Sequence, residues 1–164
     1  MLSERASCRL PVPASAIAID AWLFSLSDGA YRDAAKAHLG AGTFRAPDGR
    51  RGFFDAEGFA GAFIVNHHLE EEARSDYVRV RSRDSRAWLL RLIPLQLEVC
   101  WEMAVRPAGS TACEVECRLG IALPYRALEL LARALGVPAL HRRHNQEQLH
   151  GFAASILAGA ARPA

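Results

Sequence analysis

The amino-acid sequence predicts an α+β domain in which one curved antiparallel sheet wraps a long C-terminal helix. Apolar residues in the range Thr43–Leu123 alternate with the period of two that is typical of strands. The range Pro124–Leu157 shows helical spacing instead. Its last turns carry an i, i+3, i+4, i+7, i+8 stripe, formed by Leu149, Phe152, Ala153, Ile156 and Leu157. Because a sheet and a helix each bury one face, packing six to seven strands on this helix is the simplest arrangement.

The first forty residues predict one strand followed by two short helices. Residues Cys8–Val12 alternate weakly, as a first strand would. Residues Ile19–Leu26 carry an apolar stripe at helical spacing, which the run Ser27–Gly29 interrupts. A second short helix is expected over Tyr31–Leu39, ending at Gly40.

The clearest hairpin joins Leu97–Arg106 to Thr111–Ile121 through the loop Ala108–Ser110. Gly109 in that loop suits a left-handed backbone position. A three-residue loop predicts four apolar pairs on one face: Val105 with Cys113, Met103 with Val115, Trp101 with Cys117, and Val99 with Leu119. The opposite face is polar. A shift by one residue would bury charge, so the pattern predicts one dry face and one solvated face.

The C-terminal helical segment contains a predicted break. Gly136 and Pro138 resemble a C-cap glycine and the proline that often follows it, so the helix either kinks there or restarts at Pro138. The polar run His141–Gln148 predicts an exposed turn or a wet cavity mouth. Residues Gly159–Ala164 have nothing to pack against, and we expect them to fray.

Length and composition limit the class of protein. The 164 residues predict one domain over 1–164. A net charge of +2 is too small to indicate a nucleic-acid surface. The longest apolar run, Ala87–Val105, is interrupted by charged residues, so no membrane span is expected. The N-terminus lacks a signal-peptide core, which predicts a cytoplasmic protein. Lys36 is the only lysine, a bias typical of GC-rich bacterial coding sequences.

Neither the cysteines nor the histidines form a known metal-ligand signature. The four cysteines, which are Cys8, Cys100, Cys113 and Cys117, lack zinc-pair spacing and predict buried, reduced thiols. His141, His144 and Glu147 lie at i, i+3 and i+6 of a possible helix, but two arginines crowd them and their spacing matches no known site. The sequence therefore predicts no bound metal and no cofactor.

The order of elements resembles the START-like, or SRPBCC, helix-grip superfamily, which includes polyketide cyclases, plant pathogenesis-related proteins and lipid-transfer domains. The run Leu10–Ser15 leading into Ala21–Phe24 is similar to its first strand and first helix. The resemblance implies a cavity between sheet and terminal helix that holds an apolar or aromatic ligand, with no universal catalytic motif. The NTF2-like cone fold is a rival, but it usually ends on strands, whereas this chain ends on a helix.

His67 is the most informative single candidate. Alternation groups it with Phe63, Val65 and Leu69 on a face that we expect to be concave. An imidazole there could orient a ligand or act as a general acid or base. The alternative is a core-edge histidine that hydrogen-bonds a backbone carbonyl. His68 falls on the other face, so the two histidines should not share a metal. The predicted ligand-lining residues are Phe63, Val65, His67, Leu69, Trp88, Val99, Trp101, Met103, Val115 and Phe152.

Three functions remain compatible with these observations. The first is a binding protein whose cavity holds a hydrophobic small molecule, such as a lipid or an aromatic metabolite. The second is a cyclase- or aromatase-like enzyme in which His67, with Tyr77 or Arg91, promotes enolisation and ring closure. The third is a partner-binding domain with a filled core. The sequence specifies no oligomeric state.

Overall fold

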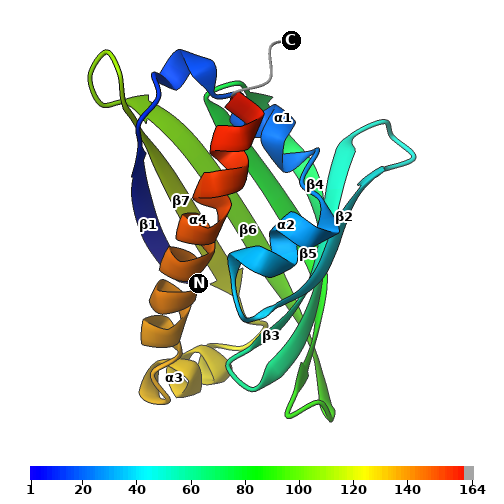
Figure 1. Cartoon of the computed structure of the whole chain (residues 1–164). Coiled ribbons are helices and arrows are strands. Elements are labelled where there is room, and N and C mark those ends of the chain that lie inside the picture. The colour runs from blue at the N-terminus through cyan, green and yellow to red at the C-terminus, as the bar shows by residue number, and fades with distance from the viewer. Residues whose placement is uncertain (161–164) are drawn as a thin grey trace.

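One seven-stranded antiparallel sheet curves around a long helix (Figure 1). The computed structural model describes residues 1–160. The strands are β1 (Leu2–Leu10), β2 (His38–Arg45), β3 (Arg51–Phe59), β4 (Ala62–Arg74), β5 (Tyr77–Leu89), β6 (Ile93–Pro107) and β7 (Cys113–Ala122). The helices are α1 (Ile19–Leu23), α2 (Asp28–Ala34), α3 (Arg126–Ala134) and α4 (Val137–Ala160), preceded by a short 3-10 turn at Ala14–Ala16. No helix in residues 1–160 is long and apolar enough to cross a membrane.

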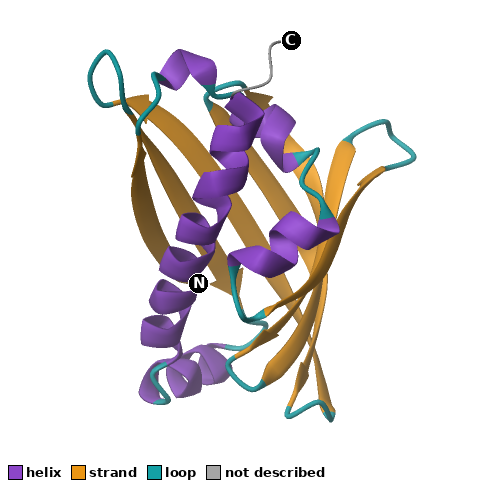
Figure 2. Cartoon of the chain, viewed as in Figure 1, coloured by secondary structure: helices purple, strands orange, loops and turns teal. Residues whose placement is uncertain are grey.

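The strand order β1-β7-β6-β5-β4-β3-β2 places the first strand beside the last. Figure 2 shows that the helices all lie on one face of the sheet. Helix α4 crosses the concave face and packs along β1 and α2, while α3 covers one end. The predicted α+β class, with two short helices after the first strand and a long terminal helix, is confirmed.

An aromatic cluster forms the centre of the core. Phe152 of α4 is fully buried and meets Trp22 of α1 edge-on, with ring centroids 5.1 Å apart. The same ring stacks on Trp101 of β6 at 5.8 Å. Tyr31 of α2 contacts Phe53 of β3 at 5.8 Å. Helices and sheet are thus held together by rings drawn from five elements, and a buried ring of this size typically contributes a few kcal/mol.

The register of the β6–β7 hairpin differs by two residues from the predicted one. Val105 lies opposite Val115, and Trp101 lies opposite Leu119. The cause is the loop, which spans five residues between β6 and β7 rather than three. Gly109 does have the expected left-handed backbone, with φ of +109°. Because side chains alternate with a period of two, the shift leaves every predicted core residue on the core face.

The terminal helical segment restarts rather than kinks. Helix α3 ends at Ala134, Gly136 has φ of +75°, and α4 begins at Val137. Of the two alternatives predicted for His141–Gln148, the exposed turn is wrong, because this run is helical and part of it is buried. Three of its residues line a small cavity instead, which is closer to the predicted cavity mouth. Within the expected frayed tail, residues 159 and 160 belong to α4, and residues 161–164 lie outside the described part of the chain.

The N-terminal elements also have different limits from those expected. The first strand begins earlier, at Leu2. The second short helix ends at Ala34 rather than at Leu39, and residues from His38 onward already belong to β2. The side chain of Ser27 caps this helix by accepting a hydrogen bond from the backbone N–H of Ala30 at 3.2 Å. His38 lies within the range expected to be helical, but because the helix ends earlier it is a buried residue of β2.

Candidate functional site

A polar patch lies on the concave face of the sheet, beneath α4. Asp55 of β3 and Asn66 and His68 of β4 are all at least 97 % buried, and Glu57 of β3 lies beside them. Alternation directs these four side chains to the same face as Phe53, Phe59 and Ile64. Buried carboxylates and imidazoles are costly unless they are paired, so such a group in a core is a candidate site.

The predicted position of His67 is wrong. His67 is exposed, and Phe63, Val65 and Leu69 are half-buried on the same convex face of β4. Trp88 of β5 contacts Phe63 on that outer face, with ring centroids 5.6 Å apart. The convex face of β4 is the more apolar of the two in sequence, yet the face with Asn66 and His68 is buried, where both side chains pair with Asp55 of β3.

The other predicted lining residues occupy the core, as expected. Val99 and Trp101 of β6 border the same small cavity as the polar patch. Three more, which are Met103, Val115 and Phe152, are fully buried in the surrounding core. Of the remaining acid–base candidates, Tyr77 begins β5 and Arg91 is exposed in the turn after it. A ligand-binding role for any of these residues remains a prediction.

Helix α4 supplies the second half of the polar cluster, from the run that the sequence predicted to be an exposed turn or a wet cavity mouth. His141, His144, Asn145 and Gln148 are buried at i, i+3, i+4 and i+7. This spacing continues the apolar stripe of Leu149, Phe152 and Ile156 toward the N-terminus of the helix. The periodicity was therefore a usable signal, because a polar stripe in line with an apolar one indicates the same buried face.

Two histidine–carboxylate pairs hold the cluster together. His68 Nε2 lies 3.1 Å from Asp55 Oδ1, and Asn66 donates to Asp55 Oδ2 at 2.7 Å. His144 Nε2 lies 3.5 Å from Glu57 Oε2, and the hydroxyl of Tyr31 donates to Glu57 Oε1 at 2.8 Å. These contacts join α2, α4, β3 and β4 around one point.

The pairs also control charge. Burial acts to raise the pKa of Glu57, but the neighbouring imidazoles of His144 and His38, with the hydrogen bond from Tyr31, hold that pKa at about 2. Burial likewise acts to lower the pKa of His144, but Glu57 raises it overall. Burial and the neighbouring His144 lower the pKa of His141 to about 4. At neutral pH the cluster therefore contains an ionised Glu57 beside a neutral His141.

A cavity of about 20 Å³ lies among these side chains, which is room for about one water molecule. Several buried polar atoms of its lining find no hydrogen-bond partner in the described residues 1–160. These atoms are Asn66 Oδ1, His68 Nδ1, both ring nitrogens of His141, and His144 Nε2. Since each unpaired buried polar group costs about 1–3 kcal/mol, the cavity is suited to a polar guest.

An apolar groove of about 160 Å³ adjoins this cavity, at the end of the sheet covered by α3. Phe59, Ile64 and Ile121 line both spaces. Above the groove, α3 presents the stripe of Leu128, Leu131, Ala132 and Leu135, yet no residue of α3 is buried. The two spaces together form a site that is apolar at its outer end and polar at its inner end.

Several solved structures of other proteins share this architecture. No protein-family profile and no curated protein sequence matches the chain. Among solved structures, it is similar to the protein TTHA0849 from Thermus thermophilus, with a TM-score of 0.69, 16% identity, and 97% of this chain and 99% of that one covered. A START superfamily protein from Mycobacterium smegmatis has a TM-score of 0.62 and 12% identity, covering 95% and 97%. The Zhui aromatase/cyclase from a Streptomyces species has a TM-score of 0.59 and 10% identity, covering 98% and 93%.

The chain has the START-like helix-grip fold. At these identities the likeness establishes the fold alone, so the chemistry of this START-like domain has to be argued from its own residues. The resemblance noted in the order of its elements is confirmed for the fold, and the small polar cavity lies between the sheet and α4.

Proposed function

We propose that this START-like domain binds a small amphipathic molecule. The apolar body of the ligand lies in the groove under α3, and its polar group enters the histidine–carboxylate cavity. The observation that carries the proposal is the adjacency of the two spaces, which share Phe59, Ile64 and Ile121 as wall residues. Ligand sites typically combine apolar walls with a few convergent polar groups, and this arrangement has both.

Helix α3 supports the proposal because none of its residues is buried, so its apolar stripe is only partly covered. Leu131 is 54% exposed and Leu135 is 69% exposed, although both border the groove. The groove is smaller than the ~300–1,000 Å³ of typical ligand sites. Since no residue of α3 is buried, an outward movement of this helix enlarges the groove at little cost in packing.

Binding of an apolar fluorescent probe tests the proposal, with two variants of the same strand. Ala62 of β4 faces the groove, so Ala62→Phe places a ring inside it. Val65 lies on the convex face of β4, so Val65→Phe adds a ring of the same size outside. We expect saturable binding at about one site, weakened at least tenfold by Ala62→Phe and unchanged by Val65→Phe. Absence of saturable binding, or equal binding by both variants, would contradict the proposal.

An enzyme of the aromatase or cyclase type is the second candidate, favoured by the pairing of His68 with Asp55. Because His68 Nε2 contacts the Asp55 carboxylate at 3.1 Å, Nε2 carries the proton. The other ring nitrogen, Nδ1, has no partner among residues 1–160 and belongs to the cavity lining. An imidazole oriented in this way can remove a proton next to a carbonyl, which is the first step of enolisation. His67, exposed on the outer face, is not in a position to do so.

Exchange of an acidic C–H proton separates the enzyme from the binding protein. A bound 1,3-diketone probe in deuterated water should exchange its α-proton faster than in free solution. Replacing His68→Asn should slow that exchange by roughly a hundredfold while the probe still binds. If wild-type protein binds the diketone without accelerating exchange, the domain is a binding protein and this second function is wrong.

A further inference from the structure

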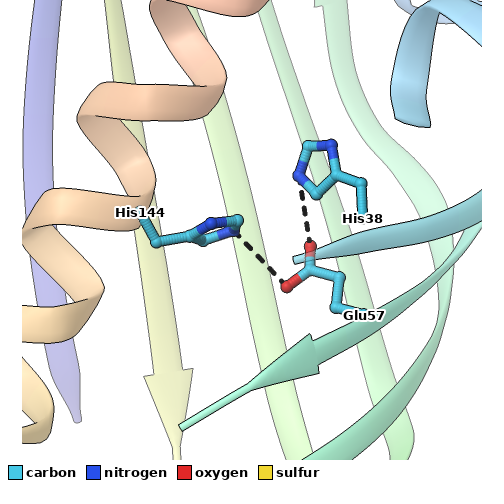
Figure 3. A group of neighbouring side chains, drawn as sticks. All are labelled: His38, Glu57 and His144. Carbon is cyan, nitrogen blue, oxygen red and sulfur yellow. Dashed lines mark ion pairs between the residues drawn. The ribbon is translucent and has the colours of Figure 1, made fainter. Parts of the chain in front are cut away.

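Three side chains from distant parts of the chain converge beside the polar cavity, and Figure 3 shows how they point toward one another. They are His38 from the start of β2, Glu57 from β3 and His144 from α4. Their potential ligand atoms all lie within 4.8 Å of one another. The Nε2 atoms of His38 and His144 lie 3.9 Å and 3.5 Å from the two oxygens of Glu57. Two imidazoles and one carboxylate are a common donor set for zinc and other divalent transition metals.

The hydrogen bonds of His38 fix the orientation of its ring. Its Nδ1 lies 2.6 Å from the carbonyl oxygen of Tyr31. A carbonyl oxygen only accepts hydrogen bonds, so Nδ1 carries the proton and Nε2 of the neutral ring presents a lone pair. That lone pair faces Glu57 and also Gln148 Oε1, which is 3.3 Å away. A histidine held by a backbone carbonyl on one nitrogen is the usual state of a metal ligand.

The amide of Gln148 is fixed in this orientation by a further chain of hydrogen bonds. Asn145 Nδ2 donates to the carbonyl oxygens of Glu4 and Cys117, both at 3.2 Å. Its Oδ1 therefore accepts from Gln148 Nε2 at 3.0 Å, which turns Gln148 Oε1 toward His38. As a result, His38 Nε2, the Glu57 carboxylate and Gln148 Oε1 form a group of acceptors that needs a cation among them.

The surroundings also resemble those of a built metal site. His38 and His144 are each 95% buried, and His144 Nε2 has no hydrogen-bond partner in residues 1–160. Tyr31 donates to Glu57 Oε1 at 2.8 Å and stacks on the His38 ring at 3.8 Å, so it holds two of the three side chains. Such outer contacts orient the ligands of metal centres.

We propose that His38, Glu57 and His144 form a binding site for a divalent transition-metal ion such as Zn²⁺. With bonds of ~2.0–2.1 Å, tetrahedral ligand atoms lie about 3.3 Å apart, so small side-chain movements close the site. Glu57, His144 and Gln148 also line the cavity. One coordination position therefore remains open toward it, for a water molecule or the polar group of a bound molecule.

Zinc titration of untagged, chelator-treated protein tests the proposal. We expect one Zn²⁺ per chain by calorimetry, with a rise in thermal midpoint on binding. Glu57→Gln and His144→Gln should each weaken binding at least a hundredfold. His141→Gln is the matched control, because His141 lies on the same helix and borders the same cavity but is outside the three. It should change affinity no more than a few-fold.

Cobalt(II) keeps the test decisive if one variant does not fold. Bound to the wild-type protein, Co²⁺ should give the visible absorption of a four- or five-coordinate N/O site. Thiolate charge-transfer bands would assign the metal to cysteine and overturn the proposal. Absence of stoichiometric binding would also overturn the proposal, because the cation at His38 would then be a proton. Equal binding by all variants would overturn it as well. Apolar-probe binding by the metal-free protein is measured separately, so failure of the metal site and failure of the proposed ligand site are distinguishable.

Discussion

A close approach between helices α2 and α4 depends on Gly151, so Gly151→Ala should destabilise the domain. A Cβ built on Gly151 of α4 meets the backbone of Ala34, the last residue of α2, with the carbonyl carbon at 2.6 Å and the carbonyl oxygen and Cα closer still. Ordinary contacts lie at 3.4–4 Å. Neither backbone can rotate away, so the helices must separate. Overpacking of this kind costs ~1–3 kcal/mol or more, while the higher helix propensity of alanine compensates for at most about 1 kcal/mol.

We therefore expect Gly151→Ala to lose about 2 kcal/mol of unfolding free energy. For a chain of this length that lowers the thermal midpoint by roughly 4–8 °C, measurable by calorimetry or circular dichroism. Gly159→Ala is the control, because Gly159 lies in the same helix with open space around it. It should be neutral or stabilising by at most about 1 kcal/mol. A Gly151→Ala protein that melts at or above the wild-type temperature would refute the packing argument.

Three further predictions concern other parts of the domain. His67→Ala should leave stability and probe binding unchanged, because His67 is exposed on the convex face. A clear loss of probe binding would instead indicate that the binding site lies on the convex face. A thiol titration of denatured, unreduced protein should count four thiols, since all four cysteines are free. In the native state Cys117 should react slowly, because burial raises its pKa to about 12. Fewer than four would indicate a disulfide. Burial and the neighbouring His144 lower the pKa of His141 to about 4, although Glu4 and Glu57 act to raise it. On acidification the imidazole of the unfolded chain is therefore protonated before that of the folded domain. The domain should lose up to about 3 kcal/mol of unfolding free energy as pH falls from about 6.5 to 4. His141→Gln should flatten that slope in pH-dependent denaturation, and an unchanged slope would contradict the assignment.

Periodicity in the sequence determined the arrangement of strands and helices. Alternation over β6 and β7 identified the buried face correctly, even though the register itself was displaced by two residues. A two-residue shift is invisible to a pattern whose period is two, and only the geometry of the five-residue loop sets it. The stripe ending at Leu157 likewise identified the face of α4 that packs on the sheet.

The buried face of β4 was decided by tertiary contacts. Its convex face carries more apolar side chains than its buried face, and the buried face holds Asn66 and His68, which both pair with Asp55 on the neighbouring strand. Sequence alternation separates the two faces of a strand but does not state which one is covered. His67 was placed in the interior because its face is the more apolar one, and its neighbour His68 occupies the position expected for it.

The cluster of His38, Glu57 and His144 is the feature that local sequence could least reveal. His38 and His144 are separated by most of the chain, and neither has a ligand-spaced neighbour. The sequence alone determined that a helix would close over a curved sheet, because hydrophobic periodicity is a local property of each segment. Which polar side chains meet beneath that helix was decided by the tertiary structure, because strand pairing and the close α2–α4 contact bring together residues that no short-range pattern connects.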